Sequence, residues 1–232
     1  MKITETEIGG APAVLYGDGA EKAYLFVHGL FGNKYEAGRF ARVVSGAGYD
    51  VLAVDLPEHG GRDDGKKLVP WEVVPQIRAA LGWLDERYAG VSLRTTSVGT
   101  YFSLLAAGAG DVVVEKCLAV SPLVDMVSMI NGVMAANGVD DDRLERERVI
   151  EVPGGQPLSW EYLTYAKEHP VRTSFPVHIL CGEKDEVVPF ETVERFAEEN
   201  AADITVIPGA MHWIHLDDEV AEMEEWERRY TS

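Results

Sequence analysis

The sequence is organised around the run Val91-Ser92-Leu93-Arg94-Thr95-Thr96-Ser97-Val98-Gly99-Thr100-Tyr101-Phe102-Ser103-Leu104-Leu105-Ala106-Ala107. Its first part, up to Thr96, is apolar and β-branched and predicts a strand, whereas Tyr101 and Leu104 begin a pattern with helical spacing. Ser97 therefore lies on a tight turn between a strand and a helix. Such a turn exposes the serine hydroxyl above the sheet, next to helix N–H groups that stabilise negative charge. This is the geometry of a nucleophile elbow.

The elbow motif is incomplete in this sequence. The usual pattern is Gly-x-Ser-x-Gly, because side chains two residues away from the serine crowd the packed strand and helix. Gly99 is retained, but Thr95 occupies the first glycine position and Thr100 follows Gly99. The branched Thr95 is expected to tilt the elbow and lower activity. On this window alone, an ordinary exposed serine stays an open alternative.

Length and composition fit one soluble domain of 232 residues, with 46% hydrophobic and 26% charged residues. The sequence contains no apolar run long enough to span a bilayer, and its opening residues lack the apolar core of a signal peptide. We therefore expect a cytoplasmic protein. Cys117 and Cys181 lie in apolar strand-like runs without metal or redox spacing, which predicts two buried free thiols.

The net charge limits the possible partners. The chain has 21 lysines and arginines against 39 aspartates and glutamates, a formal charge of −18. This charge repels phosphate backbones and anionic membrane surfaces. We therefore expect neither a nucleic acid nor a membrane as partner, and the sequence leaves the oligomeric state open.

The segments around the elbow alternate between strands and helices, which predicts an α/β domain with a mostly parallel sheet. An opening hairpin is expected to form one sheet edge. The predicted strands are Ile3–Glu7, Ala13–Tyr16, Ala23–Val27, Asp50–Asp55, a strand within Val112–Val120, Pro176–Cys181 and Ile204–Ile207. The predicted helices outside the elbow are Tyr35–Ala47, Val73–Tyr88 with Pro75 near its first turn, Phe190–Asn200 and Glu219–Tyr230.

Residues 123–175 interrupt this alternation and are too many for a plain connection. We expect an insertion of short helices that forms a lid over the carboxyl edge of the sheet. Ser159 is a candidate helix cap in this insertion. Three aromatic residues after it line a pocket or form the packing face of the helix, and the sequence leaves both alternatives open: Trp160, Tyr162 and Tyr165.

Three side chains on separate loops supply the groups that neutral ester hydrolysis requires. A serine nucleophile needs a base with a pKa near neutrality and an acid that orients that base. Ser97, Asp185 and His212 occur in the order Ser, Asp, His, and each follows a predicted buried strand. The loop His28–Lys34 also leaves a buried strand, and there the backbone N–H of Leu30 is a candidate oxyanion donor.

The chain resembles the α/β-hydrolase fold, and its layout is most similar to small bacterial serine esterases of the feruloyl and cinnamoyl esterase type. The resemblance covers nearly the whole chain. Its motifs are Phe26–Lys34, Asp55–Gly60, Ser97-Val98-Gly99, Gly182–Pro189 and Gly209-Ala210-Met211-His212. It implies that Ser97 is the nucleophile, His212 the base and Asp185 the acid. It also implies that the N–H groups of Leu30 and Val98 form the oxyanion hole.

Other polar residues near these motifs are expected to be non-catalytic. His59 precedes the elbow, whereas sites of this kind take their acid and base from later strands. His215 lacks a third ligand for a metal, and His178 is expected to be buried in its strand. Glu183 and Glu186 flank Asp185 and are alternatives to it, although the Gly-x-x-Asp spacing favours Asp185.

The sequence thus predicts a hydrolase that cleaves a small carboxylic ester through an acyl-enzyme, without an organic cofactor or metal. A thioesterase and a peptidase for short acyl groups would share this mechanism. A relative that only binds a ligand is the alternative from another class. The sequence identifies neither the acyl group nor the alcohol of the substrate.

Overall fold

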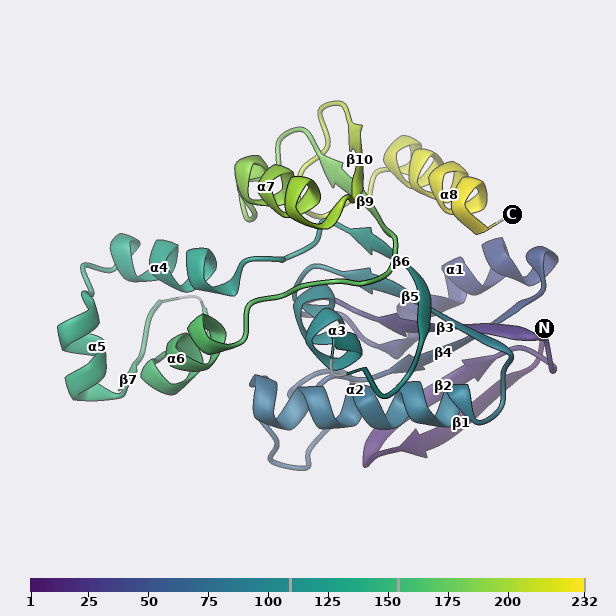
Figure 1. Cartoon of the computed structure of the whole chain (residues 1–232), viewed down its shortest axis with the longest axis horizontal. Helices are drawn as coiled ribbons and strands as arrows, with labels where there is room; N and C mark the ends of the chain where they lie inside the picture. The colour runs from purple at the N-terminus through teal and green to yellow at the C-terminus, as the bar shows by residue number, and fades with distance from the viewer. Residues whose placement is uncertain (109, 154, 232) are drawn as a thin grey trace. The chain divides into compact units, whose positions relative to one another are not determined.

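The structure is a computed structural model that describes residues 1–108, 110–153 and 155–231. It divides into two compact units: Met1–Val124 together with the chain from Arg172 onward, and Asp125–Val171. The first unit contains an eight-stranded sheet in the order β1-β2-β4-β3-β5-β6-β9-β10 (Figure 1). Its strands are β1 (Ile3–Ile8), β2 (Ala11–Tyr16), β3 (Lys22–Val27), β4 (Tyr49–Val54), β5 (Gly90–Thr96), β6 (Val114–Val120), β9 (Val177–Gly182) and β10 (Asp203–Ile207).

The sheet is parallel except at β2, which pairs antiparallel with both β1 and β4. The predicted hairpin at the sheet edge is therefore confirmed. Strands β1 and β10 form the two edges of the sheet, and the interior strands β3 and β4 are buried along nearly their whole length. Such strands are covered on both faces, which explains their continuous apolar sequences.

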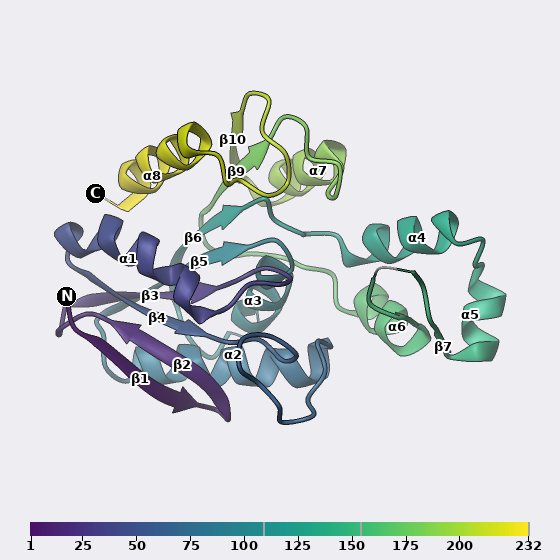
Figure 2. The ribbon, with the colours of Figure 1, turned by 180° about the vertical axis from the view of Figure 1, so that it is seen from behind.

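Helices cover both faces of the sheet. Figures 1 and 2 show α2 (Pro70–Asp85) and α3 (Val98–Gly108) on one face and α1 (Ala37–Val44) and α8 (Asp217–Thr231) on the other. This unit also contains α7 (Phe190–Asn200). Side chains at alternate positions of β3, such as Tyr24 and Phe26, join the core beneath α1 and α8. This alternation follows from the two-residue period of a strand.

Two predicted helices differ in detail from the structure. The helix expected over residues 35–47 consists of α1 between two short 3₁₀ segments, Lys34–Glu36 and Ser45–Ala47. Helix α2 begins at Pro70, not near Val73, because proline is well tolerated at the first helical position. Pro75 consequently lies in the second turn, and its expected place near the first turn is wrong.

The second unit contains α4 (Met126–Ala136), α5 (Asp141–Glu147) and α6 (Trp160–Glu168). The side chain of Ser159 accepts a hydrogen bond from the Tyr162 N–H, so the predicted helix cap is present. The short antiparallel pair β7 (Val149–Ile150) and β8 (Leu158–Ser159) was not expected. The function of this unit as a lid stays a prediction. Within the part of the chain that the structure describes, no helix is long and apolar enough to cross a membrane.

Candidate active site

Ser97 lies on the turn between β5 and α3. Its φ of 49° is in the left-handed region, which is uncommon for a residue with a side chain and is typical of this kind of elbow. Two backbone bonds fix the turn, because the Ser97 N–H donates to the carbonyl of Val120 and the Leu123 N–H donates to the carbonyl of Ser97. The end of β6 therefore holds the backbone of the elbow.

Ser97, His212 and Asp185 form one chain of hydrogen bonds. His212 Nε2 lies 2.9 Å from Ser97 Oγ, and His212 Nδ1 lies 2.7 Å from Asp185 Oδ2. The three residues follow β5, β10 and β9, whose carboxyl ends lie at the same edge of the sheet because these strands are parallel. The structure thus places the three residues at the distances that a nucleophile, its base and an orienting acid require.

Asp185 is held as a carboxylate. Its Oδ1 accepts hydrogen bonds from the N–H groups of Val187 and Val188, while Oδ2 faces His212. Burial raises the pKa of this carboxyl group, but the bonds from His212 and from the two N–H groups outweigh burial and hold the pKa below its ordinary value. Asp185 therefore stays charged near neutrality and can stabilise a protonated His212.

The loop after β3 lies against the elbow. A Cβ atom built on Gly29 would be 3.2 Å from Ser97 Cβ, so the backbone before Leu30 runs beside the serine. A Cβ on Gly99 would be 2.8 Å from the carbonyl oxygen of Val27, which is closer than real side chains come. Gly99 is thus required because β3 passes close to α3. This packing brings the loop of Leu30 and the first turn of α3, which begins at Val98, to the same side of the elbow.

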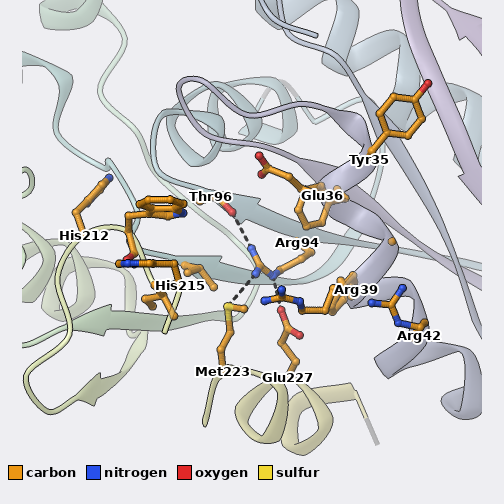
Figure 3. A pocket seen from close by; sticks show the side chains of 16 residues that line it. Tyr35, Glu36, Arg39, Arg42, Arg94, Thr96, His212, His215, Met223 and Glu227 are labelled. Atoms are coloured by element: carbon orange, nitrogen blue, oxygen red, sulfur yellow. Dashed lines mark hydrogen bonds and ion pairs between the residues drawn. The ribbon is translucent and has the colours of Figure 1, made fainter. Parts of the chain in front are cut away.

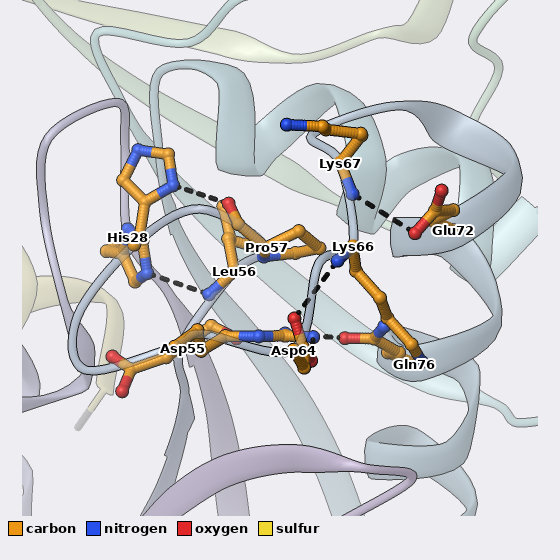
Figure 4. A network of polar contacts seen from close by, with 11 residues as sticks. His28, Asp55, Leu56, Pro57, Asp64, Lys66, Lys67, Glu72 and Gln76 are labelled. Carbon is orange, nitrogen blue, oxygen red and sulfur yellow. Dashed lines mark hydrogen bonds and ion pairs between the residues drawn. The ribbon is translucent and has the colours of Figure 1, made fainter.

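His28 anchors this loop from within the protein. It is fully buried, and the Leu56 N–H donates to its Nε2 over 3.0 Å (Figure 4). Because Nε2 accepts, Nδ1 carries the proton and donates to the Gly29 carbonyl oxygen at 2.7 Å. Burial lowers the pKa of His28 to about 4, so the ring is neutral at physiological pH. This histidine therefore fixes the orientation of the peptide group that carries the Leu30 N–H.

A buried ion pair supports the other end of the loop. Asp55 Oδ1 accepts the backbone N–H of Lys34, and Asp55 Oδ2 lies 2.7 Å from Lys34 Nζ. Both side chains are nearly inaccessible to solvent. Sequence reasoning missed these supporting roles of His28, Lys34 and Asp55. The available signal was that His28 and Asp55 directly follow buried strands, whereas Lys34 lies at the start of a short 3₁₀ segment.

Thr95, which replaces the first glycine of the elbow motif, contacts Thr100, which follows Gly99. Their hydroxyl oxygens are 2.9 Å apart, both side chains are fully buried, and Thr95 Oγ1 also lies 3.6 Å from Cys117 Sγ. The Thr95 side chain thus occupies a space with a polar partner between β5, α3 and β6. The structure provides room for threonine at a position that usually holds glycine.

The other candidate residues lie outside the hydrogen-bond chain. Glu183 accepts the Gly209 N–H, and His59 Nδ1 lies 2.7 Å from the Pro57 carbonyl oxygen. His215 stacks on Trp213 with ring centroids 4.3 Å apart. His178 is partly exposed and hydrogen-bonded to Asp203 at the sheet edge, so its expected burial is wrong. His178 is the second residue of β9 and lies beside Asp203, the exposed first residue of the edge strand β10.

For three aromatic residues of the second unit the sequence leaves pocket lining and packing both open, and two of them have local partners within that unit. Tyr165 stacks on His169 with centroids 4.1 Å apart, and Lys167 Nζ lies 5.8 Å from the ring centre of Trp160. The buried face of α6 is formed by Leu163 and Ala166. Trp160, Tyr162 and Tyr165 are only partly buried, so substrate contact by these rings stays a prediction.

The two cysteines are buried free thiols, as expected. Burial raises the pKa of Cys117 to about 12 and that of Cys181 to about 11. Neither sulfur is therefore a thiolate near neutrality. Among the described residues, no group of three or more histidine, cysteine, aspartate or glutamate side chains is arranged to hold a metal ion.

Comparisons with known proteins identify the fold. No protein-family model and no curated protein matches the sequence. Solved structures match over almost the full length: a putative hydrolase from Agrobacterium vitis S4 has a TM-score of 0.78 at 14% identity, with 100% of this chain and 99% of that chain covered. Alpha/beta hydrolase domain-containing protein 10 from mouse has a TM-score of 0.76 at 17% identity, covering 99% of this chain and 98% of that chain.

Est1E from Butyrivibrio proteoclasticus, in a structure with bound ferulic acid, has a TM-score of 0.75 at 19% identity. The match covers 98% of this chain and 97% of that chain. These similarities, together with the sheet order and the elbow between β5 and α3, show that the chain has the α/β-hydrolase fold.

Proposed function

We propose that this protein is a serine hydrolase that cleaves a small carboxylic ester through an acyl-enzyme intermediate. One observation carries the proposal: the hydrogen bonds from Asp185 through His212 to Ser97, on a serine whose backbone has a φ of 49°. An ordinary exposed serine needs neither the strained turn nor the oriented histidine.

In the first half of the reaction, Ser97 Oγ attacks the ester carbonyl carbon while His212 Nε2 takes the hydroxyl proton. The N–H groups of Leu30 and Val98 donate to the resulting oxyanion. The carbon–oxygen bond to the alcohol then breaks, and His212 gives its proton to the departing oxygen. Asp185 stabilises the imidazolium that exists between these two proton transfers.

In the second half, water attacks the acyl-serine and gives its proton to His212. The tetrahedral intermediate collapses, Ser97 regains the proton and the carboxylic acid leaves. His28 does not touch the reacting atoms. It acts as a positioning residue, because its bond to the Gly29 carbonyl oxygen orients the peptide group that also carries the Leu30 N–H.

An ester is our first choice of substrate because Est1E, whose solved structure holds ferulic acid, is among the similar structures. A thioesterase domain from the curacin biosynthetic pathway also matches, with a TM-score of 0.63 at 15% identity, 98% of this chain and 99% of that chain being covered. A thioester is therefore the second candidate, and the same residues would act on it.

A fluorophosphonate probe tests the proposal, because rapid covalent labelling requires an activated serine and an oxyanion site. We expect labelling of Ser97, with loss of labelling in Ser97→Ala and strong suppression in His212→Ala. Ser45→Ala is the matched control, since Ser45 is an exposed serine remote from these residues, and this variant should label like the wild type. An unlabelled wild-type protein that hydrolyses no ester would refute the proposal and favour a ligand-binding relative.

A further inference from the structure

A cavity of about 600 Å³ lies in the first unit, on the sheet face that α1 and α8 cover (Figure 3). Apolar side chains from the core line part of it, including Phe26, Val120 and Met223. The mechanism described above does not use this cavity. Its volume is in the range of small-molecule binding sites.

The cavity adjoins the proposed catalytic residues. His212 lines it, and so does Thr96, the residue directly before Ser97. Glu36, in the short helix that follows the loop of Leu30, lines it from the other side. Ser97 and Leu30 themselves are not among its lining residues. The cavity is therefore next to the base and outside the place where the ester carbonyl would sit.

The cavity is cationic in a strongly acidic protein. Arg39, Arg42 and Arg94 line it against Glu36 and Glu227, whereas the whole chain carries a net charge of −18. Arg94 and Glu227 neutralise each other, because Arg94 Nε lies 2.8 Å from Glu227 Oε1 and both side chains are buried. The cationic excess therefore belongs to the two arginines of α1.

Among the described residues, Arg39 and Arg42 are not held in an ion pair, although the positive charge of Arg39 favours the charged form of the Glu227 carboxyl group. They lie three residues apart on the exposed side of α1, and in the described part of the chain neither forms an ion pair or a side-chain hydrogen bond. The Glu36 carboxylate is directed toward the preceding loop, where a Cβ on Gly32 would be 2.7 Å from Glu36 Oε1. Figure 3 accordingly shows this carboxylate pointing away from Arg42.

The position of the cavity indicates which half of an ester substrate, the acyl half or the alcohol half, would bind in it. His212 must protonate the departing alcohol oxygen, so the alcohol half leaves beside His212, while the acyl half stays on Ser97. Of these two residues, only His212 lines the cavity. We propose that the cavity receives the alcohol half of the substrate and that this half carries a carboxylate, held by Arg39 and Arg42. This inference rests on the proposed function and names its substrate class.

Matched pairs of acetate esters test this proposal. One pair is 4-acetoxybenzoate and 4-acetoxybenzamide, and a longer pair is 3-(4-acetoxyphenyl)propanoate and its amide. In each reaction, water and the ester give acetate and the corresponding phenol. The measured quantity is the ratio of kcat/KM for the anionic ester to kcat/KM for the neutral ester. A general loss of activity in a variant cancels in this ratio.

We expect a ratio above one in the wild type for at least one length, although the net charge of −18 repels anions. In Arg39→Gln/Arg42→Gln, the ratio should fall about tenfold, as expected for the loss of two exposed charge contacts. Added salt should lower the wild-type ratio if the arginines hold the carboxylate, and raise it if general repulsion dominates. Lys2→Gln/Lys66→Gln removes the same charge outside the cavity lining and should leave the ratio within about twofold of the wild type.

Three results would overturn the inference: a wild-type ratio below one at both lengths, a ratio that the arginine double variant does not change, or a ratio that rises with salt. A preference for anionic acyl groups, measured with p-nitrophenyl hydrogen adipate against its neutral amide, would contradict the assignment to the alcohol half if the acetate pairs show none. Fluorophosphonate labelling of the wild type separates this failure from failure of the proposed function. A labelled Ser97 without any preference for anions refutes only the cavity assignment.

Discussion

Replacement of His28 by asparagine tests how a buried neutral histidine supports the active-site loop. The ordinary histidine pKa of 6.5 falls to about 4 in the folded protein because the ring is buried. Between these values the unfolded chain binds a proton at this side chain and the folded chain does not. The free energy of unfolding of the wild type therefore decreases as the pH falls from about 6.5 to about 4. This one group contributes a loss of about 2 kcal/mol at pH 5 and about 3 kcal/mol once the pH is below 4.

His28→Asn removes the titration and keeps a side-chain donor near the position of Nδ1. The variant loses the acceptor for the Leu56 N–H, and leaving that buried donor unpaired should cost about 1–3 kcal/mol at pH 7. Urea unfolding of both proteins at pH 7 and pH 5 gives two stability differences. Because all other groups titrate in both proteins, the difference at pH 5 should be smaller than the difference at pH 7 by about 2 kcal/mol.

His169→Asn provides the control, because His169 is an exposed histidine and its replacement should not alter the pH dependence in this way. Fluorophosphonate labelling of His28→Asn gives a second readout. We expect slower labelling than in the wild type at pH 7, since the peptide that carries the Leu30 N–H loses part of its support. If the stability difference between wild type and His28→Asn is the same at both pH values, the assignment of a buried histidine that resists protonation is wrong.

Three further sets of substitutions test the other predictions. Asp185→Asn should leave the fold intact and lower kcat by about ten-thousandfold, because it favours the wrong histidine tautomer; a larger loss in Glu183→Gln would move the acid to that residue. Thr95→Gly should not accelerate fluorophosphonate labelling, and faster labelling of this variant would show that the elbow is crowded. Thr95→Val should lower the free energy of unfolding by about 1–3 kcal/mol, because it leaves the Thr100 hydroxyl unpaired. The double variant Thr95→Val/Thr100→Val should recover most of this lost stability. Alanine variants of Trp160, Tyr162 and Tyr165 in the second unit should change the order of kcat/KM values among short acyl and aryl esters. Unfolding of these variants without such a change would show a packing role.

The regular elements could be predicted because their apolar residues repeat with a clear period. The limits of the helix Phe190–Asn200 agree with the structure, and the predicted strands before and after the elbow differ by only a few residues. The pair β7 and β8 was missed because two residues per strand are too few to show a period. The early start of α2 was missed because Pro70 and Trp71 precede the periodic part of that helix.

For the site, the order of residues along the chain was informative and the supporting contacts were not. Ser97, Asp185 and His212 were selected by their positions after strands, and the structure brings them within hydrogen-bond distance. Their catalytic roles stay predictions. The ion pair between Arg94 and Glu227 joins residues 133 positions apart, and no local pattern indicates such a contact. Likewise, nothing in the elbow motif indicates that the hydroxyl groups of Thr95 and Thr100 pair.

The path of the chain between β6 and β9 determines how long a segment must be to replace the second unit. These two strands are parallel neighbours, so the chain that leaves the carboxyl end of β6 must return to the opposite edge of the sheet before β9 begins. The segment that contains Asp125–Val171 is therefore also the return connection of the sheet. A replacement must cross the length of a strand, about 20 Å or at least about six extended residues. A direct fusion of Val124 to Val177 should fail to fold, whereas a longer grafted module should keep the sheet.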